Sequence, residues 1–177
     1  MNKIKLGQVA GLAISLEPTG IIATLALIAI LTTIGLALLG FSPLEAVAFG
    51  LISTLLHWLG ESLHQLGHAQ AARQTGYPMT GVRYGTLGLL SAALYPRDEP
   101  PLPGALHIHR ALGGPKWSAV MALIAALLTA VLWNTTPLLR AIALLFFVEA
   151  LFVFTLGALL PLGFTDGSTI LKWRGKA

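Results

Sequence analysis

The stretch GESLHQLGHAQAARQTG, residues 60–76, places His64 and His68 four positions apart. In a helix, residues at this spacing project from one face, and two such histidines can reach one Zn²⁺ ion at about 2.0–2.1 Å. His57 and Glu61 continue the same stripe toward the N-terminus. The alternative is that these are buried polar groups that only hydrogen-bond neighbouring helices. The stretch therefore predicts a helix with a candidate metal site on one face.

The composition around this stretch is that of a membrane protein. Of the 177 residues, 55% are hydrophobic and only 10% are charged, against roughly a quarter charged in ordinary soluble domains. Four apolar segments are long enough to cross a bilayer core, which takes roughly 20 residues; they cover residues 20–39, 43–75, 115–133 and 137–162. Ionisable residues inside a membrane are costly and usually functional, which favours the metal-site interpretation.

The connecting segments predict a small amount of β-structure. Residues 12–16 form a short apolar run before the first helix, and residues 82–90 carry glycines and apolar residues without helical spacing. We therefore expect an α-helical integral membrane protein with about four transmembrane helices, an N-terminal strand, and a β-hairpin or short sheet between helices two and three. The whole chain, residues 1–177, is expected to be a single membrane-embedded core.

Basic residues predict the orientation of the chain. Ten of the eleven lie before the first helix, between the second and third, or after the fourth, and only Arg140 lies on the other side. The positive-inside rule then places both termini in the cytoplasm. A nucleic-acid partner would require a basic face, and the sequence shows none. Cysteine is absent, so any metal must be held by histidine and carboxylate.

Asp166, in LLPLGFTDGSTIL, is the best candidate for a third ligand. It lies six positions before Lys172, and His68 lies five before Arg73. Both residues are therefore expected at the same cytoplasmic depth of the membrane. An Asp-Gly turn or a helix cap is the alternative role for this aspartate.

Four elements of the chain resemble the site-2 proteases, a family of intramembrane zinc metalloproteases. LHQLGHAQAARQTGYP is similar to the family's H-E-x-G-H-x-x-x-A segment, and ALLPLGFTDGSTIL to its N-x-x-P…D-G motif. KLGQVAGLAISLEPTG resembles the strand before the first helix, and ALGGPKWS the A-G-P-x-x-N element. No PDZ or CBS domain is expected in this chain.

The resemblance implies a zinc ion held by His64, His68 and Asp166. It further implies a transmembrane protein substrate, presented as an extended strand beside the 87–94 hairpin, in a multi-pass protein of a prokaryotic cell membrane. The sequence does not predict the oligomeric state.

Three positions depart from the family pattern. Gln65 stands where the family has the glutamate that serves as general base, and an amide cannot accept that proton. Ser118 and Ala158 stand where the family's substrate-positioning asparagines are expected. Two interpretations remain open: a protease inactive for lack of its base, or a non-catalytic pseudoprotease that binds transmembrane partners. A metal or proton transporter is disfavoured because discontinuous or repeated helices are not evident.

The other polar residues have weaker predictions. Glu61 is expected to hydrogen-bond His64, or else to be a fourth ligand, a relocated base or an unrelated buried polar group. His57 is expected to hydrogen-bond Glu61, with a role as a ligand as the alternative. His107 and His109 are expected in a solvated loop or strand. Glu149 is expected to face the helix bundle and pair with a polar group.

Overall fold

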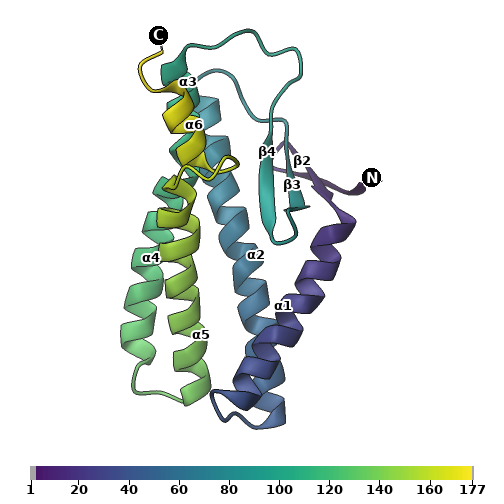
Figure 1. Cartoon of the computed structure of the whole chain (residues 1–177), viewed down its shortest axis with the longest axis vertical. Coiled ribbons are helices and arrows are strands. Elements are labelled where there is room, and N and C mark those ends of the chain that lie inside the picture. The colour runs from purple at the N-terminus through teal and green to yellow at the C-terminus, as the bar shows by residue number, and fades with distance from the viewer. Residues whose placement is uncertain (1–2, 177) are drawn as a thin grey trace.

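The computed structural model describes residues 3–176 and consists of long helices beside one small sheet (Figure 1). The long helices are α1 (Pro18–Ala37), α2 (Pro43–Gln74), α4 (Gly113–Leu132) and α5 (Pro137–Val148), and the last continues into the π-helix η1 (Glu149–Gly157). Two short helices, α3 (Gly104–Ala111) and α6 (Asp166–Trp173), lie side by side at the end of the bundle that also carries the sheet (Figure 1). The predicted fold class is confirmed.

Helix α2 begins and ends at the residues that its sequence predicts. The Ser42 side chain accepts a hydrogen bond from the Glu45 backbone N–H, and the Glu45 carboxylate accepts one from the Ser42 N–H at 3.0 Å. This reciprocal cap satisfies two donors of the first turn. Gly76, which follows the helix, has a φ of 78°, a left-handed conformation that glycine adopts without strain. The resulting 32-residue helix carries the histidine stripe.

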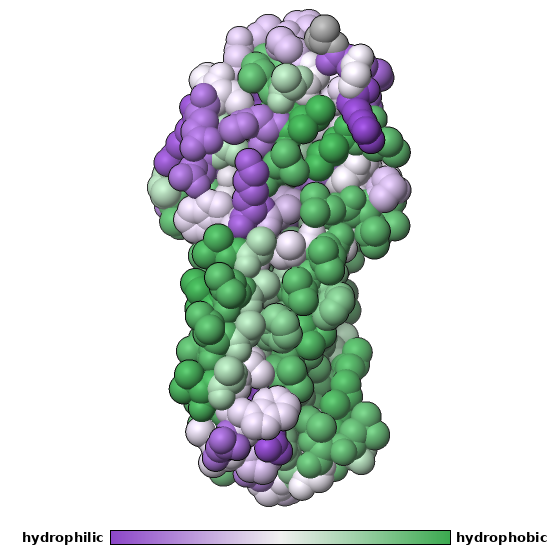
Figure 2. Space-filling model, turned by 90° about the vertical axis from the view of Figure 1, so that its left-hand side faces the viewer, coloured by the Kyte–Doolittle hydropathy of each residue, from purple (hydrophilic) through white to green (hydrophobic). Residues whose placement is uncertain are grey.

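Among the described residues, four helical stretches are long and apolar enough to cross a membrane: Pro18–Ala37, Pro43–Gln74, Gly104–Leu132 and Pro137–Gly157. On the face seen in Figure 2 the middle of the molecule is an apolar band, and polar side chains gather at the end with the sheet and, over a smaller area, at the opposite end. Of the apolar residues in these helices, Leu25, Leu123 and Val131 are 62%, 63% and 75% exposed. Apolar surface of this extent is stable in lipid rather than water, so the chain is a membrane protein.

Glycines bring the helices close together around the histidine stripe. A Cβ at Gly67 would collide with the backbone of Gly113, and a Cβ at Gly113 would collide with the backbone of Gly67. A Cβ at Gly60 would collide with the Phe154 ring. Small residues permit close helix contact in membranes. These contacts pack α4 and η1 directly against the part of α2 that carries the polar stripe.

The sheet contains four strands in the order β1-β2-β3-β4: β1 (Ile4–Val9), β2 (Leu12–Leu16), β3 (Gly81–Thr86) and β4 (Leu90–Leu94). Pairing is antiparallel within each hairpin, and β2 and β3 are parallel. Strand β2 and the β3–β4 hairpin agree with the prediction. Strand β1 was not expected. Leu12, Met79 and Val82 pack on Ala69 and Ala72 of α2, which fixes the sheet against this helix.

The segment that contains His107 and His109 is helical, so its prediction as a loop or strand was wrong. Helix α3 begins directly after Pro103. The His107 ring stacks on Trp173 of α6 with centroids 4.1 Å apart, and His109 Nε2 lies 3.0 Å from Gln74 Oε1. These contacts join α3 to α6 and to α2. They stabilise a short helix that the pattern of apolar residues in the sequence does not predict.

The end of the fourth span has π-helical rather than α-helical geometry. In a π-helix the hydrogen bonds join residues five apart, and the Thr155 hydroxyl likewise donates to the Ala150 carbonyl five residues earlier. Residues five apart therefore lie on one face. Glu149 and Phe154 have this spacing, and both contact α2 through His57.

Candidate metal centre

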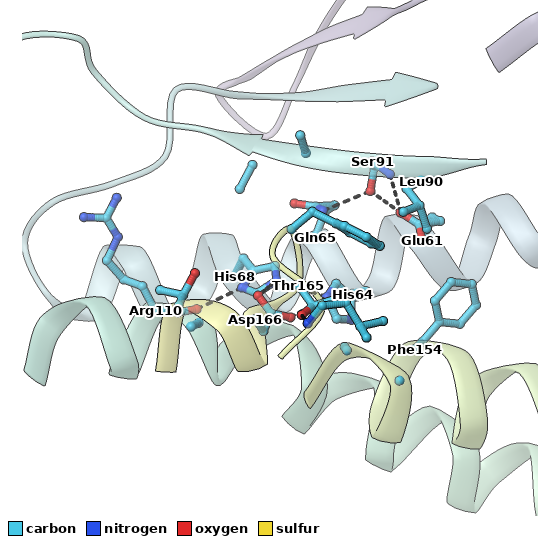
Figure 3. A pocket seen from close by; sticks show the side chains of 18 of the residues that line it. Glu61, His64, Gln65, His68, Leu90, Ser91, Arg110, Phe154, Thr165 and Asp166 are labelled. Carbon is cyan, nitrogen blue, oxygen red and sulfur yellow. Dashed lines mark hydrogen bonds and ion pairs between the residues drawn. The ribbon is translucent and has the colours of Figure 1, made fainter. Parts of the chain in front are cut away.

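His64 and His68 of α2 meet Asp166, the first residue of α6, at the end of the bundle beside the sheet (Figure 3). The two Nε2 atoms lie 3.0 Å apart. Asp166 Oδ2 lies 3.2 Å from His64 Nε2, and Oδ1 lies 3.3 Å from His68 Nε2. His64 and Asp166 are 102 positions apart in the chain. The fold nevertheless brings the side chains of His64, His68 and Asp166 together around one point.

These separations, measured to the two oxygens of Asp166, are close to the spacing of ligand atoms around a tetrahedral zinc ion. Ligand atoms about 2.0–2.1 Å from one ion lie about 3.3 Å from each other. The backbone also leaves space beside them, because a Cβ built on Gly114 would collide with the Nε2 atoms of both histidines. Two histidines and a carboxylate also match the ligand types of catalytic zinc sites. The residues therefore fit a zinc ion.

The second nitrogen of each ring is held by a hydrogen bond that turns Nε2 toward the cluster. His64 Nδ1 lies 2.9 Å from Ser118 Oγ, and His68 Nδ1 lies 2.9 Å from the Arg110 carbonyl. The Gly114 N–H also points at His68 Nδ1, at a longer 3.3 Å. The Arg110 carbonyl only accepts, and it lies closer to His68 Nδ1 than the Gly114 nitrogen does. The proton of the His68 ring is therefore assigned to Nδ1, which leaves the lone pair on Nε2. Such outer contacts orient metal-binding histidines.

The Asp166 carboxylate is placed at the N-terminus of α6, and Gly167 beside it packs tightly on the Leu159 carbonyl. Burial raises the pKa of the Asp166 carboxyl, but the adjacent His64 and His68 side chains outweigh this effect and bring the pKa below its ordinary value. The cluster thus offers two imidazole nitrogens and one carboxylate to a divalent cation.

A cavity of 660 Å³ lies against the cluster. Helix α2, strand β4, η1 and α6 line it (Figure 3). The lining includes polar residues of α2 and apolar residues such as Phe152, Val153 and Leu162. A cavity of this size accommodates several residues of a polypeptide or a small molecule.

Gln65 lies in the cavity lining beside His64, and its amide reaches β4. Gln65 Nε2 donates to Ser91 Oγ at 2.9 Å. The same serine contacts Glu61, whose carboxylate accepts from the Ser91 N–H at 2.9 Å and from the Ser91 hydroxyl. Figure 3 shows both contacts meeting at Ser91. The sequence pattern gave no signal for Ser91, because a serine in a strand carries no motif.

Glu61 and His57 lie on the predicted stripe but contact other groups than the ligands. Ser118 occupies the second nitrogen of His64, where Glu61 was a candidate partner. His57 Nδ1 lies 2.5 Å from a Glu149 carboxylate oxygen, and His57 Nε2 lies 2.9 Å from the Leu89 carbonyl. Glu149 therefore pairs with a polar group of the bundle.

The two positions aligned with the family's asparagines have different surroundings. Ala158 lines the cavity. Ser118 is fully buried at 0% exposure, and its hydroxyl contacts His64. Its contact makes Ser118 an orienting group for His64, and its role toward a substrate stays a prediction.

Comparison with solved structures identifies this architecture as an intramembrane protease-like fold. The chain is similar to the structure described as "Site-2 Protease from Methanocaldococcus jannaschii", with a TM-score of 0.66 and 22% sequence identity, over 97% of this chain and 70% of that one. No protein-family model and no curated protein matches the chain. At this identity the likeness establishes the fold, and the roles of individual residues stay predictions.

Proposed function

We propose that this chain is a zinc-binding relative of the intramembrane proteases that receives a transmembrane polypeptide in its cavity. His64, His68 and Asp166 would hold the ion. The observation that best supports this proposal is that the three side chains converge on one point. Contacts with Ser118 and with the Arg110 carbonyl turn both Nε2 atoms toward that point. A zinc ion bound here supplies a Lewis acid that polarises a carbonyl and activates water.

The edge of β4 is the proposed docking place for an extended chain. Backbone groups of a strand point alternately to its two sides. Side chains of α2 contact the Leu89 carbonyl and the Ser91 N–H on the side away from β3, so Ala93 directs its backbone groups to the same side. Ala93 also lines the cavity. An added strand would pair with these remaining groups.

Gln65 is expected to prevent efficient cleavage. General base catalysis contributes about 10²–10⁴-fold to a reaction rate, and an amide cannot accept the proton. Gln65 is not one of the three candidate metal ligands. The chain as written is therefore proposed to bind zinc and a polypeptide and to cleave poorly; binding alone is the second candidate function.

Zinc content tests the proposal directly. Purified protein should carry about one zinc per chain, and His64→Ala, His68→Ala and Asp166→Ala should each lose it, because three protein ligands are the usual minimum for such sites. His109→Ala is the matched control, since this histidine contacts Gln74 outside the cluster. Unchanged zinc in all three variants would rule out the proposed site.

A cleavage assay completes the test. The unmodified chain, incubated with a fusion protein that carries one transmembrane helix, should leave it intact. Cleavage that a zinc chelator abolishes would contradict the role assigned to Gln65 and would identify another base.

A further inference from the structure

The contacts of Glu61, Ser91 and Gln65 form a continuous chain between α2 and β4. Ser91 stands between the other two: its backbone N–H and hydroxyl contact the Glu61 carboxylate, and its Oγ accepts from Gln65 Nε2. Glu61 and Gln65 are 4% and 5% exposed. Because buried polar groups that lack partners are costly, the donors and acceptors of this chain must match.

A serine hydroxyl has one proton and two lone pairs. When Glu61 is ionised its carboxylate only accepts, so the Ser91 hydroxyl gives its proton to Glu61. The serine oxygen then has only lone pairs to offer to residue 65. An amide nitrogen donates to such an oxygen, and Gln65 Nε2 does so at 2.9 Å. The presence of Glu61 thus fixes the orientation of the Gln65 amide.

A glutamate at position 65 does not satisfy this arrangement. One of its oxygens would face the Ser91 oxygen, whose proton is already committed. The other would take the place of Gln65 Oε1, which is buried without a hydrogen-bond partner among the described residues. A buried charge that lacks partners costs more than a neutral amide. The surroundings of residue 65 therefore accept glutamine and disfavour glutamate as long as residue 61 is a carboxylate.

We propose that Glu61 and Gln65 are a matched pair coupled through Ser91, so that the carboxylate of this site belongs at position 61 and the neutral amide at position 65. Gln65 is then a built-in part of the site rather than an isolated loss of a base. Glu61 is a positioning residue, since it acts on residue 65 through the serine. The consequence for cleavage rests on the proposed function; the pairing itself does not.

A double-mutant cycle on the full chain in detergent or nanodiscs tests the pairing. Gln65→Glu should lower the melting temperature by about 2–12 °C, since it leaves a buried charged group without partners in a chain of this size. The double variant Glu61→Gln with Gln65→Glu should recover most of this loss. In that variant the Ser91 hydroxyl can donate to the new carboxylate at position 65, while the new amide carbonyl at position 61 accepts from the Ser91 N–H.

Two controls define the result. Gln70→Glu makes the same change on the same helix, where the exposed side chain keeps its acceptor role toward Trp117 Nε1, and should leave the melting temperature unchanged. Ser91→Ala should abolish the coupling between positions 61 and 65. Additive effects of the two substitutions, or a Gln65→Glu variant as stable as the original chain, would overturn the proposal.

The cleavage rate is a further measurement, and it would not differ between these variants if Glu61 had a purely structural role. With the fusion substrate, the double variant should cleave at least tenfold faster than Gln65→Glu alone. Measurable and equal cleavage rates in the two variants would contradict the positioning role of Glu61. A double variant that regains stability and zinc but cleaves nothing, like every other variant, would overturn the proposed protease-like function, while the cycle would still establish the pair.

Discussion

His57 Nδ1 lies 2.5 Å from a carboxylate oxygen of Glu149, across the interface between α2 and η1. The other nitrogen of the ring faces the Leu89 carbonyl at 2.9 Å. The Leu89 carbonyl only accepts, so Nε2 carries the one proton that a neutral imidazole has. The contact between Nδ1 and the carboxylate therefore needs a second proton, which must lie between these two groups. Three elements, α2, η1 and the β3–β4 hairpin, are joined at this one ring.

Removing the carboxylate of Glu149 should loosen this junction. Glu149→Leu leaves His57 Nδ1 without a partner in an apolar layer, at a cost of about 1–3 kcal/mol, and should lower the melting temperature by about 2–12 °C. Glu149→Gln keeps an acceptor and should lose less than half as much. Thermal unfolding of both variants checks this, and equal losses would show that the His57 contact is not the cause.

Ser118→Ala should weaken zinc binding without abolishing it. The hydroxyl orients His64 through Nδ1, and loss of such an outer contact typically costs about 10–100-fold in metal affinity. Competition with a chelator of known affinity measures the change. Ser53→Ala is the matched control, because this buried hydroxyl has no partner among the described residues. An affinity loss no larger than that of the control would contradict the orienting role.

Gly114→Ala should eliminate zinc while leaving the helices assembled. The added methyl group would collide with the Nε2 atoms of both histidines, so the rings would have to move away from the positions in which they meet Asp166. Zinc content should fall to near zero, and the helical circular dichroism should be unchanged. Lys116→Ala, two residues further along the same helix, should keep its zinc. A full zinc load in Gly114→Ala would place the ion elsewhere.

The orientation in the membrane can be read by labelling single cysteines, since the chain has none of its own. Asn134 lies in the turn between α4 and α5, at the end of the bundle opposite the sheet (Figure 1). Asn134→Cys should react with an impermeant reagent from outside the cell, whereas Asp98→Cys and Lys176→Cys should be protected. The reverse pattern would overturn the cytoplasmic placement of both termini.

Regular spacing made α2 and its neighbours predictable from the sequence. The stripe from His57 to His68 needs only helical geometry, and the proximity of Asp166 to the two histidines follows from membrane depth, which the basic residues mark. The structure confirms that proximity, while the role of the three residues as ligands stays a prediction.

The missed features all depend on partners distant in the chain. Ser91 acquires its role because the β3–β4 hairpin packs on α2, and Ser118 because glycine contacts bring α4 against the same helix. All residues of strand β1 are exposed, and its apolar residues Ile4, Leu6 and Val9 do not keep the regular alternation that marks a half-buried strand. Tertiary packing, rather than local sequence, decides these elements.

The π-helical turn at Glu149–Gly157 affects how this chain should be aligned with others. An alignment that assumes uniform α-helical spacing from residue 137 onward cannot place both Glu149 and Phe154 on the face that contacts His57, because residues five apart share a face only where the turn is widened. A relative with an unbroken α-helix would need one residue fewer in this stretch. Every position beyond it, including Ala158, would otherwise be compared with the wrong residue. A gap within this turn is therefore a structural expectation, and it offers a marker by which relatives that share the widened turn can be recognised from sequence.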